Sequence, residues 1–404
     1  MVGTRSGERL AIDGGRPVRS TLLPYAHQVI DERDIEAVTA ALRSDWLTTG
    51  PRVPAFEAAL AAETGARHAV AFSSGTAALH GAAAVAGLGP GDEAITTPMT
   101  FVASANAVLY VGATPRFADI IEGSLLIDPD AVAAAMTERT RAIVAVDYAG
   151  QPADYAALRT IADAAPGGPL TIIADASHSL GATFDGRPVG TLADLTVLSL
   201  HPAKILTTGE GGAVLTDRDD LAAALRRFRN HGIETELAAR RDWTYAMVEL
   251  GFNYRLTDIA AALGSAQLER LEAWLARRRH LAARYLERLA GHPAIDLPEV
   301  DRRADPSWHF MFARLRLERL TADRGTIYHA LRAEGIGVNV HYIPVHMHPF
   351  YRARFPGLSF PVAEAAYERL LTLPLHAGMS DADLDDVVAA LDKVSSAYRG
   401  GEQR

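Results

Sequence analysis

Cysteine is absent from this chain of 404 residues. Its absence excludes disulfides, thiolate metal sites and iron–sulfur clusters. Long apolar runs are missing too: none approaches the ~18 to 20 residues that a membrane-spanning helix needs, and the first residues lack the apolar stretch of a secretory signal. We therefore expect a cytoplasmic protein that holds no metal and does not contact a membrane.

The chain also lacks an excess of positive charge, since its formal net charge is −9. Sequence-independent binding of nucleic acid depends on many cations that neutralise phosphates, so this charge balance argues against it. Hydrophobic residues make up 49% and charged residues 22%, the usual mix of a globular protein with a large core. The length suits about two to three domains.

Lysine is nearly absent. Lys204 and Lys393 are the only lysines among 40 basic residues. Arginine has replaced lysine almost everywhere else, so a lysine that persists is expected to need its amine. A desolvated lysine can lose its proton and form an imine, whereas arginine cannot. A solvated surface charge is the usual alternative for a lysine, and we rank it below the chemical role for Lys204.

Apolar runs and helical stretches alternate up to about residue 217 and predict an α/β fold. Near-continuous β-branched runs between helices are typical of a mostly parallel sheet buried on both faces. The predicted strands are 69–72, 93–96, 115–118, 141–146, 170–174, 195–200 and 212–216. The predicted helices are 31–42, 76–88, 101–110, 218–230, 256–290, 324–334 and 380–396.

Three parts follow from this pattern. Residues 1–23 are expected to form an extended arm, because Gly14, Gly15 and Pro17 interrupt any helix. Residues 24–280 are expected to form a large domain around the parallel sheet. After Pro293 the pattern changes, so residues 281–404 are expected to form a smaller C-terminal α/β domain.

Polar residues that follow the predicted strands are the candidates for a site, because ligands of α/β sheets bind outside the carboxyl ends of the strands. Ser73 to Thr76 lie between a strand and a helix, where free N–H groups can bind a phosphate; such a turn can also serve packing alone. Asp175 ends a buried run, and a buried carboxylate must be paired, hydrated or functional. It could equally cap the next turn.

Three further candidates flank the same predicted strands. His178 lies three residues after Asp175 and would contact a ligand or be a satisfied core histidine. Lys204 follows the predicted strand 195–200 and precedes a tight polar turn, TTGEGG. Ser199 could supply a hydroxyl to a phosphate, or only a hydrogen bond to the turn.

The order of these features resembles that of fold-type I pyridoxal-phosphate enzymes: a phosphate turn, an Asp at a strand end, and a Lys nearly 30 residues later. More narrowly, and over nearly its whole length, the chain resembles the sugar aminotransferase family called DegT/DnrJ/EryC1/StrS. The matching stretches are SDWLTTGP at 44–51, SSGTAALH at 73–80, GDEAITTPMTFVASANA at 91–107, VDYAGQPAD at 146–154, ADASHSLGA at 174–182, HPAKILTTGEGGAV at 201–214, GFNYRLTDIAAALGSAQL at 251–268, HYIPVH at 341–346 and LTLPLHAGMS at 371–380.

The resemblance implies a fold-type I transferase with a seven-stranded type of sheet, and pyridoxal 5′-phosphate as cofactor. It implies that Lys204 is the catalytic lysine that holds the cofactor covalently, Asp175 the partner of its ring nitrogen, and His178 a residue beside its ring. The other cofactor positions that it implies are Phe101, which stacks on the ring, and Gly75, Thr76 and Ser199, which bind the phosphate.

The resemblance also implies a partner subunit and a substrate pocket. Asn253 matches a residue that reaches the phosphate from the neighbouring subunit, which implies a homodimer with shared sites. The positions implied for substrate binding are Thr49, His231, His341 and Tyr342. Two positions depart from the family pattern: Ala174 stands where Glu is frequent and Leu200 where an aromatic is frequent, so the packing of the pocket can differ.

The expected reaction is transfer of an amino group, with glutamate as donor, to a keto-sugar. Related sugar dehydratases carry His at the position of Lys204, so a lysine here favours transamination. The runs LPYAHQVIDERDI, DYAGQP and RNHGIE resemble enzymes that aminate C4 of UDP-linked 4-keto-6-deoxy-N-acetylhexosamines, so a nucleotide-linked 4-keto-6-deoxyhexose is the expected substrate. Two alternatives stay open: amination of a keto-inositol to an aminocyclitol, and a non-catalytic regulatory protein on the same fold.

Overall fold

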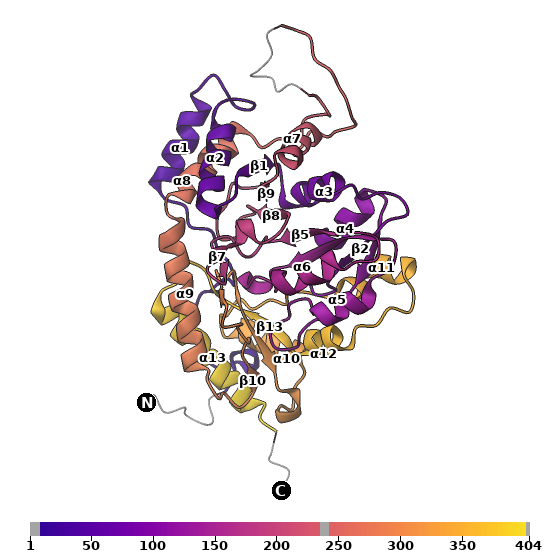
Figure 1. Cartoon of the computed structure of the whole chain (residues 1–404). Coiled ribbons are helices and arrows are strands. Elements are labelled where there is room, and N and C mark those ends of the chain that lie inside the picture. The colour runs from indigo at the N-terminus through magenta and orange to yellow at the C-terminus, as the bar shows by residue number, and fades with distance from the viewer. Residues whose placement is uncertain (1–8, 235–241, 401–404) are drawn as a thin grey trace.

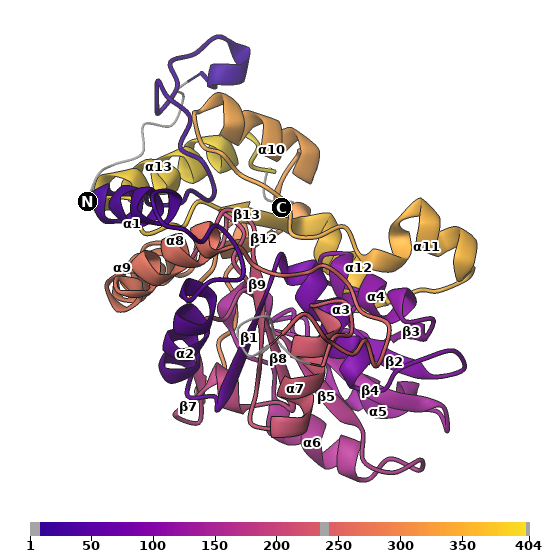
Figure 2. The ribbon, with the colours of Figure 1, turned by 90° about the horizontal axis from the view of Figure 1, so that it is seen from above.

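The computed structural model describes residues 9–234 and 242–400. Residues 1–8, part of the predicted arm, lie outside the described residues. Two layers are visible in Figure 1: a large one that contains the strands labelled β1, β2, β5, β8 and β9, and a smaller one built from the orange and yellow C-terminal part of the chain. Seen from above, helices α10 to α13 gather on one side of the molecule (Figure 2).

A seven-stranded sheet forms the centre of the large layer, in the order β1-β9-β8-β5-β4-β2-β3. Strand β9 is antiparallel to both of its neighbours, and all other neighbours are parallel. The predicted mostly parallel sheet is thus confirmed, within one or two residues at each strand end. Its strands are β1 (His68–Phe72), β2 (Glu93–Thr96), β3 (Thr114–Phe117), β4 (Thr140–Val146), β5 (Thr171–Asp175), β8 (Leu195–Ser199) and β9 (Gly212–Thr216).

Helices cover both faces of this sheet, as the continuous apolar strands require. Within β4, Val144 packs in the cluster of α3, α4 and α7, whereas Ile143 and Ala145 pack in the cluster of α5 and α6. Neighbouring side chains of a strand point to opposite faces, so each strand feeds two cores. The helices of this layer are α1 (Glu32–Leu42), α2 (Arg52–Thr64), α3 (Gly75–Val85), α4 (Ala103–Tyr110), α5 (Pro129–Ala135), α6 (Tyr155–Asp163), α7 (Asp219–Phe228) and α8 (Asp258–Leu268).

The C-terminal layer is built on a second sheet, in the order β10-β12-β13, with antiparallel neighbours. A third small sheet, β11-β6-β7, joins a strand of this layer to a hairpin of the large one. The elements are α9 (Leu271–Arg288), β10 (Ile295–Asp296), β11 (Ala304–Asp305), β12 (Met311–Leu315), α10 (Arg324–Ala333), α11 (Pro349–Arg354), α12 (Pro361–Arg369), β13 (Leu370–Leu373) and α13 (Asp381–Ala397), with β6 (Thr183–Phe184) and β7 (Arg187–Pro188). Single 3-10 turns lie at Ala11–Asp13, Tyr148–Gly150, Val189–Thr191, Leu317–Arg319 and Val345–Met347.

One predicted helix is wrong: residues 256–290 form two helices, α8 and α9, separated at Glu269 and Arg270. The Arg270 guanidinium binds Asp31 and the buried Asp34 of the segment around α1. Helix α8 therefore stays packed on α1, while α9 runs towards the C-terminal layer. The predicted domain boundary after residue 280 falls inside α9, and the division into arm, large domain and small domain stays a prediction.

A buried carboxylate of the C-terminal layer binds the arm at several points. Glu334, which follows α10 and is fully buried, accepts hydrogen bonds from the N–H groups of Ala11 and Val18 at 2.8 and 3.0 Å. Lys393 of α13 donates to the same carboxylate at 2.8 Å and to the carbonyl of Arg16. The second lysine of the chain therefore has a partner that explains its presence.

We expect Glu334→Ala to release the arm. It leaves two N–H groups without their acceptor and the Lys393 ammonium without its charged partner, and breaking a buried pair in this way costs about 3 to 5 kcal/mol. Trypsin should then cleave after Arg19 under native conditions, and the Tm should fall. Glu318→Ala, at an exposed position, is the control. Unchanged cleavage and Tm in the Glu334 variant would show that the arm is held by its other contacts.

Candidate active site

The candidate residues of the large layer meet at the carboxyl edge of the seven-stranded sheet. Asp175 is the last residue of β5 and Ser199 the last of the neighbouring strand β8. The turn after β1 reaches the same place: a Cβ added to Gly75 would lie 2.9 Å from Cβ of Ser199. The sheet order therefore brings together the turn at Gly75 and the ends of β5 and β8, although Gly75 and Ser199 are more than 120 residues apart in sequence.

The phosphate turn opens helix α3. Ser74 caps the helix, with its hydroxyl accepting from the N–H of Ala77 at 3.1 Å. The N–H groups of Gly75 and Thr76 lie in the first turn, where an α-helix offers them no acceptor. Any side chain at position 75 would collide with Ser199, so glycine is needed for this approach. Free N–H groups and a nearby hydroxyl at a helix N-terminus suit a phosphate.

Asp175 is a buried carboxylate that is stabilised by hydroxyl groups. Its two oxygens accept from Ser104 Oγ and Ser177 Oγ, each at 2.6 Å. Among the described residues no basic side chain forms an ion pair with it. An ionised carboxylate in this position keeps its charge available for a cationic group placed beside it.

Lys204 lies in the loop after β8, where its N–H donates to the carbonyl of His201 at 2.8 Å. Burial lowers the pKa of its amine from 10.5 to about 8, while the negative charge of Asp175 opposes the shift. A substantial fraction of the amine is thus neutral near pH 8, as a nucleophile or proton carrier requires.

His178 is buried beside this lysine. Its Nε2 forms a hydrogen bond with the Tyr342 hydroxyl at 3.1 Å, and its Nδ1 is buried without a partner. Burial, with smaller contributions from Lys204 and His341, holds the pKa of His178 well below its usual value. The ring is therefore neutral and has one nitrogen left for a ligand.

The C-terminal layer adds two of the four predicted substrate residues to this cluster. The ring centroids of Tyr342 and Phe101 lie 6.1 Å apart. Phe101 is 57% exposed and can therefore receive a flat ligand. His341 bonds to Thr372 through Nδ1 at 2.8 Å. Its burial, followed by the charge of Lys204, lowers its pKa to about 3.

The other predicted residues lie elsewhere in this chain. Asn253 is exposed and pairs with Asn230 through an antiparallel bridge, next to His231. Thr49 lies in a turn that Asp258 holds through the N–H of Gly50. Within residues 9–234 and 242–400, no hydrogen bond or ring contact joins Asn253, His231 or Thr49 to Lys204, Asp175 or His178.

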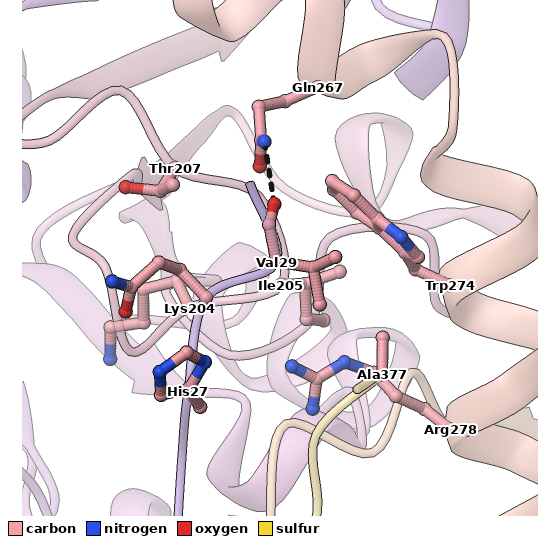
Figure 3. Close-up of a pocket in the computed structure, with 10 residues that line it drawn as sticks. His27, Val29, Lys204, Ile205, Thr207, Gln267, Trp274, Arg278 and Ala377 are labelled. Carbon is pink, nitrogen blue, oxygen red and sulfur yellow. Dashed lines mark hydrogen bonds between the residues drawn. The ribbon is translucent and has the colours of Figure 1, made fainter. Parts of the chain in front are cut away.

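The structure also adds residues that the sequence analysis did not single out. Ser104 and Ser177 hold Asp175, and His309 stacks on His178 with ring centroids 4.5 Å apart. The segment after the arm borders Lys204 as well: His27, Gln28 and Val29 line a small pocket beside it, together with residues of α8 and α9 (Figure 3). In the sequence, only the position of Ser104, three residues after Phe101 and on the first turn of the predicted helix, could have indicated these additional residues.

A second buried carboxylate, Asp147, lies near Asp175. Asp147 follows β4 and accepts from Ser179 Oγ, Tyr155 Oη and the N–H of Ala153 at 2.5, 2.6 and 2.9 Å. Burial raises its pKa to about 7; its hydrogen-bond donors oppose the shift, and the charge of Asp175 adds to it. Asp147 thus fixes the loop after β4 against the segment that carries Asp175 and His178.

Comparison with known proteins identifies the family. The model of the DegT/DnrJ/EryC1/StrS aminotransferase family matches residues 28–392. The chain belongs to this family. It is 39% identical over 380 residues, which cover 92% of this chain and 97% of the other, to the spore coat polysaccharide biosynthesis protein SpsC of Bacillus subtilis.

Two solved structures show the same fold over nearly the whole chain. One is the sugar aminotransferase Spr1654 of Streptococcus pneumoniae in its pyridoxal-phosphate form, described as putative, with 31% identity, a TM-score of 0.86, and coverage of 93% of this chain and 99% of the other. The other is DesI, solved in the presence of its TDP-sugar product, with 34% identity, a TM-score of 0.86 and 96% coverage of each chain. This family member is thus a pyridoxal-phosphate-dependent sugar aminotransferase.

Two features, a membrane-spanning helix and a group of metal ligands, are absent from the part of the chain that the structure describes. Among them, no helix is both long and apolar enough to cross a membrane. No group of three or more His, Asp or Glu side chains in the same ranges is placed to hold a metal ion.

We expect Asp147→Asn to change the pH dependence of stability. The folded protein keeps a proton on Asp147 up to about pH 7, whereas the unfolded chain releases it near pH 4, so the stability of the wild type falls as pH rises through that window. The variant lacks this loss. Between about pH 5 and pH 8 its stability relative to wild type should therefore rise by about 1 to 3 kcal/mol.

Urea unfolding at the two pH values measures this difference. Asp163→Asn, at an exposed position, is the control and should show no comparable change. A constant difference between wild type and the Asp147 variant would mean that Asp147 is ionised throughout.

Proposed function

We propose that this enzyme transfers the amino group of an amino acid, glutamate, to a nucleotide-linked 4-keto-6-deoxyhexose, as a cytoplasmic homodimer with shared active sites. The observation that carries the proposal is the meeting of three groups at one sheet edge: a helix N-terminus suited to a phosphate, a buried carboxylate that forms no ion pair among the described residues, and a lysine whose pKa is about 8. When bound, pyridoxal phosphate supplies an electron sink that stabilises negative charge on the carbon next to the transferred amino group.

The three groups fit different parts of that cofactor. The N–H groups of Gly75 and Thr76, with the hydroxyl of Ser199, would bind its phosphate. Asp175 would hold a proton on its ring nitrogen, because Ser104 and Ser177 keep the carboxylate in place without neutralising it. The exposed face of Phe101 and the unpartnered Nδ1 of His178 would fix the plane of the ring. These assignments extend the family's chemistry to the residues of this chain.

Lys204 has two tasks in this proposal. Its nitrogen would hold the cofactor covalently in the absence of substrate, and as a free amine it would carry a proton to and from the substrate carbon. Both tasks require loss of the ammonium proton near neutral pH. Burial provides this, since the lowered pKa of about 8 leaves the amine able to accept and return a proton.

The substrate is expected to lie between this cluster and the C-terminal layer. His341 and Tyr342 enter the cluster from that layer and would contact the sugar, with Tyr342 close to Phe101. DesI, which shares 34% identity, was solved with a TDP-sugar product, and this supports a nucleotide-linked sugar. Turnover on UDP- and TDP-linked 4-keto-6-deoxyhexoses and on a keto-inositol would test the choice; turnover confined to the keto-inositol would reject it.

The first prediction here concerns Lys204. Borohydride treatment of the holoenzyme should link the cofactor irreversibly to Lys204, and peptide mass mapping should find it there. Lys204→Ala should lower transamination by several orders of magnitude, because no other amine can replace it. Lys393→Arg is the matched control, since it removes the only other lysine, keeps a positive charge beside Glu334 and should keep activity. Label on Lys393, or full activity of Lys204→Ala, would refute the assignment.

The shared-site dimer rests on the surface next to Asn253. Trp243 and Leu250, which precede α8, are 88% and 76% exposed, and the described residues that lead into α8 extend from the body of the molecule (Figure 1). Exposed large apolar side chains in such number mark an interaction surface. A groove of about 450 Å³ lies beside the same region, lined by Ser73 and Arg255 and by apolar residues of α1 and α8. We propose that a second copy covers this surface and receives Asn253.

Mixing two inactive variants tests the shared site. In a heterodimer of Lys204→Ala and Asn253→Asp, one site carries both lesions and the other carries neither. Random pairing should restore roughly a quarter of the wild-type activity, since half of the dimers are mixed and half of their sites are intact. The control pair, Lys204→Ala with Asp175→Asn, damages both sites of every heterodimer and should restore nothing. No recovery from a mixture shown to contain heterodimers would place Asn253 and Lys204 in the same subunit's site.

A further inference from the structure

His309 is a buried histidine of the C-terminal layer that none of the proposed roles uses. It lies just before β12, is only 3% exposed, and has a buried Nδ1 without a hydrogen-bond partner. Its ring stacks on that of His178, with centroids 4.5 Å apart and an angle of 28° between the planes. A buried polar ring without a partner on one nitrogen is costly, so its contact with a residue of the site calls for an explanation.

The backbone around His309 is held firmly. Its N–H donates to the carbonyl of Ala149 at 2.9 Å, and its carbonyl accepts from the buried Arg278 guanidinium at 3.0 Å. Two residues earlier, Ser307 donates its hydroxyl to the carbonyl of His178 at 2.9 Å. The segment 307–309 is thus bound to the backbone that carries His178, and the ring of His309 has a fixed position relative to it.

His178 is then restrained through both its backbone and its ring. In addition to the stacking with His309, Nε2 of His178 forms a hydrogen bond with the Tyr342 hydroxyl. The rings of His178 and Phe310 meet edge to face, with their centroids 5.3 Å apart. Burial, with the charge of Lys204 as the next cause, holds the pKa of both imidazoles well below the usual range. Two neutral rings can stack without charge repulsion, and the Nδ1 of His178 stays free for a ligand.

We propose that His309 is a positioning residue of the active site, which stacks on His178 and holds its ring in the orientation that leaves Nδ1 available to the cofactor. This inference rests on the proposed role of His178 beside the cofactor ring. His309 itself acts through His178, and its contribution comes from its flat ring. A ring that stacks without a nitrogen should therefore serve nearly as well.

Cofactor affinity of the apoenzyme, measured by absorbance titration with pyridoxal phosphate, gives a readout that is separate from turnover. The stabilisation that an aromatic pair provides predicts that His309→Leu lowers the affinity for the cofactor by about 3- to 10-fold. His309→Phe, which keeps a flat ring, should stay within about 2-fold of wild type on the same grounds. His292→Leu removes another buried histidine, away from this cluster, and controls for general loosening of the fold; thermal melts confirm that each variant folds.

The decisive measurement repeats His309→Leu in a His178→Leu background. If His309 acts through His178, its effect on affinity should nearly vanish there, because coupled residues do not add. An equal loss in both backgrounds, no loss in either, or a loss as large in His309→Phe as in His309→Leu would overturn the inference. If His178→Leu alone binds the cofactor like wild type, the proposed role of His178 fails instead, which separates the two hypotheses.

Discussion

The structure depends on keeping a lysine amine and a carboxylate close together without letting them neutralise each other. The charge of Asp175 acts on Lys204, yet no ion pair joins them among the described residues. Ser104 and Ser177 satisfy the carboxylate in place of the lysine, and burial favours the neutral amine. An ion pair here would leave the amine protonated and the carboxylate occupied, and neither group could then serve the cofactor.

The seven-stranded sheet makes this arrangement possible. Parallel strands end at the same edge, so residues at the ends of β5 and β8 meet there without a long connection. Strand β9 runs in the opposite direction between β1 and β8 and brings the turn after β1 to Ser199. The contact of Gly75 with Ser199 shows how closely the turn must approach, and why a side chain cannot be accommodated there.

The C-terminal layer contributes side chains to the cluster around Lys204, Asp175 and His178. Residues 307–310 and 341–342 enter from this layer and contact His178 and Phe101. Arg278 of α9, buried and without a carboxylate partner among the described residues, binds three carbonyls of the same layer. Burial lowers its pKa to about 10, but it remains charged, and this cation fixes α9 to the segments that carry His309 and Leu375.

The sequence by itself determined the strand pattern, the family and the residues with intrinsic chemistry, because apolar runs, rare lysines and contiguous motifs are local properties. Lys204, Asp175 and the turn at Gly75 could be recognised in this way. The break between α8 and α9 and the approach of His309 to His178 could not, because each depends on contacts between segments far apart in sequence. Only the tertiary structure decides those contacts, since packing, not local propensity, sets which buried groups face one another.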